Sequence, residues 1–188
     1  MESLQGHALV ASPYLTDPNF LRSVVYLLRH DEEGAIGLIL NRPLETTVGQ
    51  VLSDITGRTI DNARPIYYGG PVDGPLMLLQ ACEQHSVPSI YIASDQERIV
   101  ETCSPDPAHR KPGAGSAEYR VFDGYAGWSA LQLEGELQRG GWLVWEIPAE
   151  ALFADPQELW QVAVRQIGRR ILAGGIDPSK MPEDPAYN

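Results

Sequence analysis

The chain has 188 residues, of which 43% are hydrophobic and 21% are charged, and its formal net charge is -11. This length and balance predict one globular domain that buries a core without disulfide bonds. No stretch approaches the ~18 consecutive apolar residues of a membrane-spanning helix. The first residues show neither the basic start nor the apolar core of a signal peptide, so we expect a cytoplasmic protein without membrane contact. The acidic charge repels phosphate backbones and disfavours direct nucleic-acid binding.

The N-terminal part of the chain predicts a short strand followed by a β-hairpin. The strand is expected over 7–11, and Asp17 followed by proline predicts one helical turn. Mostly apolar, β-branched runs over 22–30 and 35–41 predict two strands joined by a loop with the sequence DEEG. After a proline break at Pro43, the sequence predicts a short helix.

The rest of the chain mixes strands and helices without a regular alternation. We expect strands over 66–72, 75–82, 89–94, 118–124 and 142–148. We expect helices over 94–103, 130–139 and 155–175, each beginning with a capping box formed by Ser94 and Glu97, by Ser129 and Gln132, and by Asp155 and Glu158. This mixture predicts an α+β domain over 1–175 rather than a doubly wound sheet.

The last expected helix has the most regular pattern. Its apolar stripe predicts packing against the sheet and consists of Trp160, Ala163, Val164, Ile167 and Ile171. The arginines of the sequence RQIGRR, over 165–170, complement the negative end of the helix dipole or, alternatively, read DNA. The segment 104–118, rich in proline and glycine, is expected to be a mobile loop, and 176–188 a loosely ordered tail.

Local motifs do not point to the familiar enzyme classes. The chain has no Walker A loop and no G-x-G-x-x-G, G-x-S-x-G or H-E-x-x-H sequence. We interpret Cys82 and Cys103 as free buried thiols. Together with His85 and His109 they match the ligand types of a zinc site, but one C-x-x-H spacing is common by chance. We therefore predict neither a metal nor a cofactor.

Two arginines are candidates for anion binding. If the two strands of the hairpin pair, Arg22 at the start of the first comes close to Asn41 and Arg42 at the end of the second. A guanidinium at this place can hold a carboxylate or phosphate through two hydrogen bonds. The alternative is an internal salt bridge to one of three carboxylates: Asp17, Glu45 or Glu136.

The sequence GYAGWSALQLEGEL joins an expected strand to an expected helix. Gly124 and Gly127 allow a sharp turn and the close approach of another backbone or a ligand. Tyr125 and Trp128 place large rings at that turn, where backbone N–H groups suit an anion.

Gln132 and Glu136 follow Trp128 at the helical spacings i+4 and i+8, so we expect the three side chains to share one stripe. Two roles remain open for this stripe. It packs against the N-terminal hairpin, or it walls a cleft whose floor is the YYGGP turn with Gly69 and Gly70.

Three blocks of the sequence resemble the AlgH/YqgE family in order and spacing: 7–44, the sequence YYGGPV, and 124–143. The resemblance implies an α+β fold with a small, β-barrel-like, bifurcated sheet surrounded by helices. The family is bacterial and uncharacterised, and some members carry the label of transcriptional regulator. Leu131 stands where the family often has glycine, which leaves the start of the helix after Trp128 in question.

We interpret the chain as a non-catalytic regulatory or binding protein that acts through a small ligand or a protein partner. The alternatives are a hydrolase or redox enzyme with a site near Arg22 and Tyr125, using Asn41 and Glu136 as well, and a DNA-binding regulator. The candidate ligand-binding residues are Arg22, Asn41, Arg42, Gly69, Gly70, Tyr125, Trp128, Gln132 and Glu136.

Overall fold

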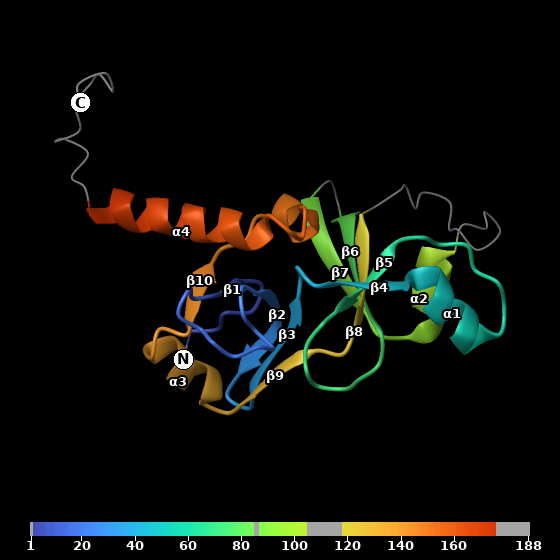
Figure 1. Ribbon diagram of the computed structural model, residues 1–188, viewed down its shortest axis with the longest axis horizontal. Helices are drawn as coiled ribbons and strands as arrows, with labels where there is room; N and C mark the ends of the chain where they lie inside the picture. Colours follow the sequence, from blue (N-terminus) through green and yellow to red (C-terminus); the bar gives the residue numbers. More distant parts are fainter. Residues whose placement is uncertain (1, 85–86, 105–117, 176–188) are drawn as a thin grey trace, which may run out of the picture.

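The structure, a computed structural model, describes residues 2–84, 87–104 and 118–175. Within these residues the chain forms two five-stranded sheets, four α-helices and a short 3-10 helix. The two sheets lie side by side, with α4 across the first and with α1 and α2 at the far end of the second (Figure 1). The predicted α+β class is confirmed, and the strands divide between two sheets without closing into a barrel in the described part of the chain.

The first sheet has the order β10-β1-β2-β3-β9, and its neighbouring strands are all antiparallel. Its strands are β1 (Ala8–Ala11), β2 (Val24–Asp31), β3 (Gly34–Ile39), β9 (Ala126–Ser129) and β10 (Trp142–Trp145). The hairpin of β2 and β3 forms as predicted. Ala8 pairs with Trp145, so the sheet joins the first and the last strand of the described residues.

The second sheet has the order β4-β5-β8-β6-β7, in which only β5 and β8 are parallel. Its strands are β4 (Pro43–Thr47), β5 (Pro65–Tyr68), β6 (Met77–Gln84), β7 (Val87–Ala93) and β8 (Tyr119–Asp123). Strand β4 was not predicted, because proline at its first residue reads as a break. Proline is compatible with β4 because this strand lies at the edge of the sheet.

The helices are α1 (Val48–Thr56), α2 (Gln96–Cys103), α3 (Gln132–Gln138) and α4 (Leu159–Gly175), with the 3-10 helix η2 at Ala149–Phe153. The cap of α2 is Asp95 rather than the predicted Ser94, since the Asp95 side chain accepts from Arg98 N. None of the helices in the described residues combines the length and apolar composition that crossing a bilayer requires.

The segment before α3 differs from the prediction. Ala126–Ser129 is not a turn but strand β9, which pairs with β3. The helix begins at Gln132, two residues later than expected, because Leu131 adopts a left-handed φ of 63°. Only half of the expected capping box forms: Gln132 Oε1 accepts from Ser129 N at 3.1 Å, while Ser129 caps no N–H of the helix.

Three apolar clusters hold the sheets and helices together. One lies under α4 and includes Phe122 and Leu38, and a second lies between the first sheet and α3 around Trp128 and Trp142. The third lies under α1 and α2 and includes the buried Cys103. The expected stripe of α4 is buried at Ala163 and Ile167, but Ile171 is 65% exposed, which corrects the prediction for that residue.

The two sheets are joined where Gly69 crosses Gly124. Gly69 N donates to Asp123 O at 2.8 Å, and Gly69 O accepts from Ile39 N at 2.9 Å. A Cβ at Gly69 would lie 2.1 Å from Gly124 O. Only glycine permits this approach, so the crossing ties β3 of the first sheet to β8 of the second.

Candidate functional site

Asn41 fixes a corner at the start of β2. Its side-chain oxygen accepts from Val24 N at 2.9 Å, and its Nδ2 donates to Arg22 O at 2.9 Å. Arg22 therefore lies in the turn before β2, with a left-handed φ of 54°, rather than in the strand as predicted. The predicted helical turn at Asp17 is a hydrogen-bonded turn, in which Asp17 O accepts from Phe20 N and Leu21 N.

The hairpin brings Arg22, Asn41 and Arg42 together, as its pairing predicts. Arg42 Nη2 donates to Pro18 O and Leu21 O, each at 3.2 Å, so this guanidinium braces the preceding turn. The Arg22 guanidinium carbon lies 5.6 Å from the centroid of the Trp160 ring, at a distance typical of a cation–π contact. Anion binding by this corner stays a prediction.

Gly69, Gly70 and Tyr125 belong to the crossing between the sheets. A Cβ at Gly70 would lie 2.3 Å from the carbonyl carbon of Tyr125. The main chain of Tyr125 exchanges two hydrogen bonds of 3.0 Å with Val72. These glycines therefore serve contact between backbones, and they do not form the expected floor under Trp128.

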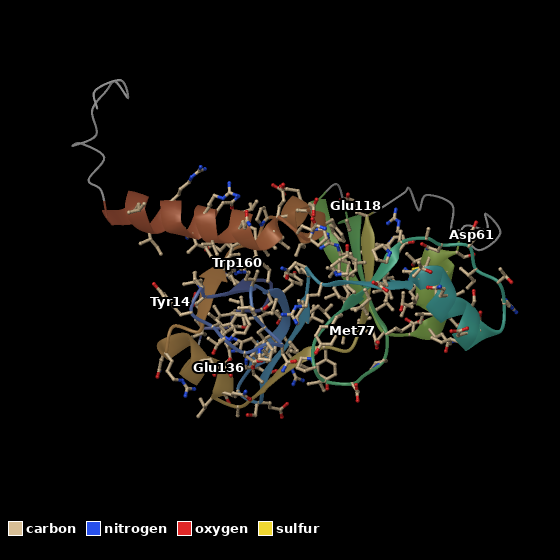
Figure 2. All side chains as sticks on the ribbon, in the orientation of Figure 1. Tyr14, Asp61, Met77, Glu118, Glu136 and Trp160 are labelled. Atoms are coloured by element: carbon tan, nitrogen blue, oxygen red, sulfur yellow. The ribbon has the colours of Figure 1, made fainter. Side chains whose placement is uncertain are left out.

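Trp128, Gln132 and Glu136 do line a common pocket, of about 440 Å³. We call it the indole–carboxylate pocket. It lies between α3 and the segment that follows β1, on the side of the first sheet where Glu136 and Tyr14 appear in Figure 2. The other lining residues are Ser12, Tyr14, Leu15, Thr16, Asp17, Phe20, Gly127, Arg139, Gly140, Gly141 and Trp142.

A single carboxylate organises this pocket. Glu136 Oε2 accepts from Trp128 Nε1 at 3.0 Å and from Trp142 Nε1 at 2.7 Å. Glu136 Oε1 accepts from Gln132 Nε2 at 3.1 Å. Because Trp128 and Trp142 are only 5% and 3% exposed, their indole N–H groups need an acceptor inside the protein, and Glu136 provides it. The alternative of an Arg22–Glu136 salt bridge is therefore wrong.

Three elements position these groups. Trp128 is fixed on β9 by its pairing with Ala35 of β3. The turn at Gly140, with φ 73°, ends α3 and directs Trp142 into β10. Phe20 completes the wall, with its ring centroid 5.9 Å from that of Trp128 and 5.4 Å from that of Trp142.

The sequence interpretation missed Phe20 and Trp142 as parts of the pocket. The sequence does contain a signal for Trp142, because this tryptophan comes directly after the Gly-Gly pair that ends an expected helix carrying a glutamate. It also missed Arg120, a buried cation of strand β8.

Arg120 is 6% exposed and binds main-chain oxygens. Its Nη1 donates to Leu40 O and to Leu152 O, each at 2.9 Å, and its Nη2 donates to Ala154 O. Burial lowers the pKa of its guanidinium, and Tyr67 beside it opposes that shift. Arg120 thus joins η2 to the second sheet, and its donors are directed at the protein's own backbone.

His30 has the carboxylate partner of a catalytic histidine but lacks a free ring nitrogen. Leu4 N donates to Nδ1 at 2.9 Å, so Nδ1 is an acceptor. The ring proton therefore sits on Nε2, which lies 3.0 Å from Glu134 Oε1. The imidazole anchors the N-terminal segment and has no nitrogen left to activate a nucleophile.

The zinc alternative lies largely outside the described residues, which exclude His85, His109 and the side chain of Cys82. The expected mobile loop and the tail are outside them as well. Cys103 is buried at the end of α2, as expected for a free thiol. Among the described residues, no three His, Cys, Asp or Glu side chains gather closely enough to hold a metal ion.

These features define an α+β protein of two joined sheets, with an indole-bound carboxylate in a surface pocket. The chain belongs to the AlgH-like family, whose sequence profile matches residues 8–172. It is 35% identical to a UPF0301 protein of Vibrio parahaemolyticus, covering 98% of this chain and 99% of the relative. It is 36% identical to a UPF0301 protein of Streptomyces coelicolor, covering 100% of this chain and 97% of the relative.

Solved structures show the same fold. The solution structure of the AlgH protein from Pseudomonas aeruginosa is 27% identical, with a TM-score of 0.65 over 99% of this chain and 96% of that one. A crystal structure of a Corynebacterium diphtheriae protein is 19% identical, with a TM-score of 0.66 over 88% of each chain, and shows likeness of fold alone.

Proposed function

We propose that this chain is a non-catalytic binding protein whose ligand occupies the indole–carboxylate pocket. The observation that carries the proposal is Glu136, a carboxylate held in place by Trp128, Trp142 and Gln132 at the wall of a pocket of about 440 Å³. A side chain fixed by three hydrogen bonds loses little freedom when a ligand binds, so its charge is preorganised.

The chemistry of the wall favours a small ligand with a cationic group. Asp17 and Glu136 supply two negative charges, while the one lining arginine, Arg139, already donates through Nε to Gly135 O at 2.8 Å. Aromatic rings attract cations through their negative faces. Phe20 provides an aromatic face at the same pocket, beside the tryptophans. An ammonium or guanidinium group matches this combination.

The arrangement favours binding over catalysis. Of the four polar side chains considered for an enzyme, only Glu136 lines the pocket. Arg22 lies against Trp160, Asn41 holds the corner before β2, and Tyr125 belongs to the sheet crossing. A regulatory role also requires a protein that responds to a ligand. We therefore interpret the family's label of regulator as regulation through a bound ligand.

The test is NMR titration of the full chain with methylammonium, tetramethylammonium and free arginine, following the indole N–H signals of the four tryptophans. We expect the signals of Trp128 and Trp142 to shift with at least one probe, while that of Trp145 stays in place. In Glu136→Gln the shift disappears. Glu45→Gln removes the same charge from the exposed strand β4 and is the matched control.

An unchanged pair of indole signals with all three cations contradicts the proposal. So does a shift that is equally large in Glu136→Gln, because the carboxylate would then have no part in binding.

A further inference from the structure

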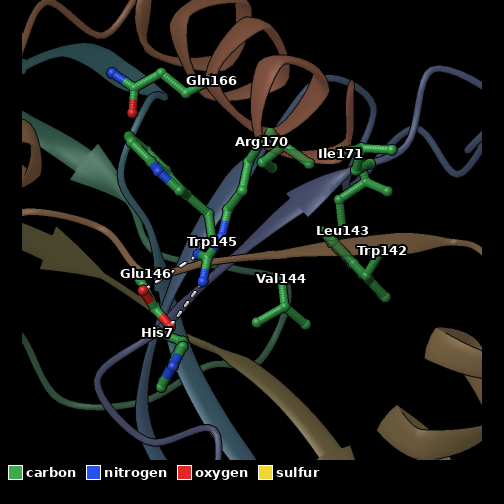
Figure 3. A pocket seen from close by; sticks show the side chains of 10 residues that line it. His7, Trp142, Leu143, Val144, Trp145, Glu146, Gln166, Arg170 and Ile171 are labelled. Carbon is green, nitrogen blue, oxygen red and sulfur yellow. Dashed lines mark hydrogen bonds and ion pairs between the residues drawn. The ribbon is translucent and has the colours of Figure 1, made fainter. Parts of the chain in front are cut away.

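A second groove, of about 770 Å³, runs along the edge of the first sheet between β10 and α4 (Figure 3). We call it the edge groove. Strand β10 forms one wall, and Gln166, Ile167, Arg170 and Ile171 of α4 form the other. Glu146 and Arg170 form an ion pair at 3.2 Å across its end, with both side chains largely exposed.

Strand β10 is an edge strand whose outward main-chain groups have no backbone partner in the described part of the chain. Ser12 N donates to Gly141 O, so the odd-numbered residues of this segment face β1. By the alternation of an antiparallel ladder, the N–H and C=O groups of Trp142 and Val144 point to the open edge. An edge of this kind is a template for another strand.

Helix α4 carries its apolar stripe beyond this edge. Leu159, Ala163 and Ile167 are buried at the i+4 spacing, but Ile171, the next residue of the stripe, is 65% exposed, and Leu172 is 66% exposed. Figure 1 shows the C-terminal part of α4 projecting past β10. A strand added at β10 would lie beneath this projecting part and cover Ile171.

We propose that the edge groove is an interface with a second copy of this chain, in which two β10 strands pair in antiparallel fashion. The twofold axis passes beside Leu143. Trp142 of each copy then exchanges main-chain hydrogen bonds with Val144 of the other, which satisfies the outward groups of both strands. Because the interface is the same on both copies, the two α4 helices run side by side over the joined sheets and cover each other's Ile171 and Leu172.

Charge complementarity favours a second copy as the occupant. The chain is acidic overall, but Arg170 of α4 lines this groove beside Glu146, so the surface that two copies bring together carries both signs of charge. In the proposed register, Glu146 at one end of β10 lies toward Arg139 at the other end in the second copy. Opposite charges therefore meet at both ends of the paired strands.

The experiment measures the mass of the full chain by size-exclusion chromatography with light scattering over a wide range of concentration. We expect the mass to approach twice the 20.7 kDa of one chain as the concentration rises. Val144→Pro removes an outward N–H and leaves the β1–β10 hydrogen bonds in place. Ile171→Lys places a charge on the projecting stripe. Both variants raise the dimer dissociation constant by at least about tenfold.

Ile55→Lys is the matched control, because Ile55 is 46% exposed on α1, away from the groove, and this variant dimerises like the wild type. Circular dichroism verifies that each variant is folded. Hydrogen exchange of the Trp142 and Val144 amides gives a second readout, slow in the wild type and fast in Ile171→Lys. A chain that stays monomeric at every concentration, or a dimer retained by either groove variant, overturns the proposal.

Discussion

Removing the Glu136 carboxylate tests whether this group organises the fold, apart from the ligand binding that we propose for it. In Glu136→Ala, the indole N–H groups of Trp128 and Trp142 lose an acceptor that lies 3.0 and 2.7 Å away. Both rings are almost fully buried, so the N–H groups cannot simply turn to solvent. The variant is expected to fold with two unsatisfied donors in the cluster between the first sheet and α3.

The size of the expected loss in stability follows from these two hydrogen bonds. A hydrogen bond to a charged group contributes about 1.5–3 kcal/mol, and Glu136 is half-buried, so we take the lower end for each. Glu136→Ala should therefore lower the free energy of unfolding by about 3 kcal/mol. Glu136→Gln keeps one acceptor oxygen and should cost about 1 kcal/mol. For a chain of this size, the alanine variant melts roughly 6–12 °C lower.

Urea unfolding followed by circular dichroism gives both free energies. Glu45→Ala, on the exposed strand β4, is the control and is expected to change stability by less than about 0.5 kcal/mol. A Trp142→Phe background removes one donor, so the cost of Glu136→Ala should fall there by about 1 kcal/mol or more. The reasoning would be refuted if Glu136→Ala and Glu136→Gln lowered the free energy of unfolding equally. It would also be refuted if Glu136→Ala cost the same with and without Trp142→Phe.

Three further predictions concern buried groups. Arg120→Lys should destabilise the chain by about 2–4 kcal/mol in urea unfolding, because one ammonium cannot reach three carbonyl oxygens. Equal free energies of unfolding for the wild type and Arg120→Lys would contradict this prediction. Gly69→Ala should cost roughly 3–5 kcal/mol or prevent folding, whereas Gly57→Ala, with nothing within 4 Å of its Cβ, should cost only about 1–2 kcal/mol for its left-handed φ. Burial raises the pKa of the Cys103 thiol to about 12, so the native thiol stays protonated where an unfolded one ionises. The contribution of the protonated Cys103 thiol to the free energy of unfolding is complete below the pKa of the thiol in the unfolded chain, near 9. This contribution is lost as the pH rises toward 12. Mass spectrometry should therefore find native Cys103 resistant to iodoacetamide at pH 7–9; labelling as fast as in urea would disprove it.

Local sequence signals predicted the elements that depend on local chemistry. The alternation of apolar runs and a short polar loop identified the hairpin of β2 and β3. Pairing of these strands was enough to bring Arg22 next to Asn41. The resemblance of three blocks to a known family supplied the α+β class, which the mixed pattern of strands and helices supported independently.

Strand β9 could not be predicted, because its stability comes from a distant partner. Ala126–Ser129 has only four residues and contains a glycine, so it carries no strand pattern of its own. Its pairing with β3, as in Trp128 with Ala35, depends on the tertiary fold. Pro43 hid β4 for a related reason: only the edge position makes proline acceptable there.

The candidate site was predicted in part. Trp128, Gln132 and Glu136 do share one pocket, although Trp128 reaches it from a strand and not from the helix. The prediction was therefore right that these three side chains are neighbours, but it was wrong that all three lie on one helix. Trp142 was missed because its indole reaches Glu136 only after the turn at Gly140 reverses the chain, and the floor was misplaced because Gly69 and Gly70 contact backbone instead.

The pairing of Ala8 with Trp145 has a consequence for synthesis on the ribosome. Strand β1 emerges early, but its partner β10 is among the last parts of the chain to be made. At about 5–20 residues per second, β1 waits on the order of ten seconds for β10. During that interval the nascent chain exposes the edge of an apolar strand to its surroundings. The first sheet is therefore completed only when its last strand, β10, has been made.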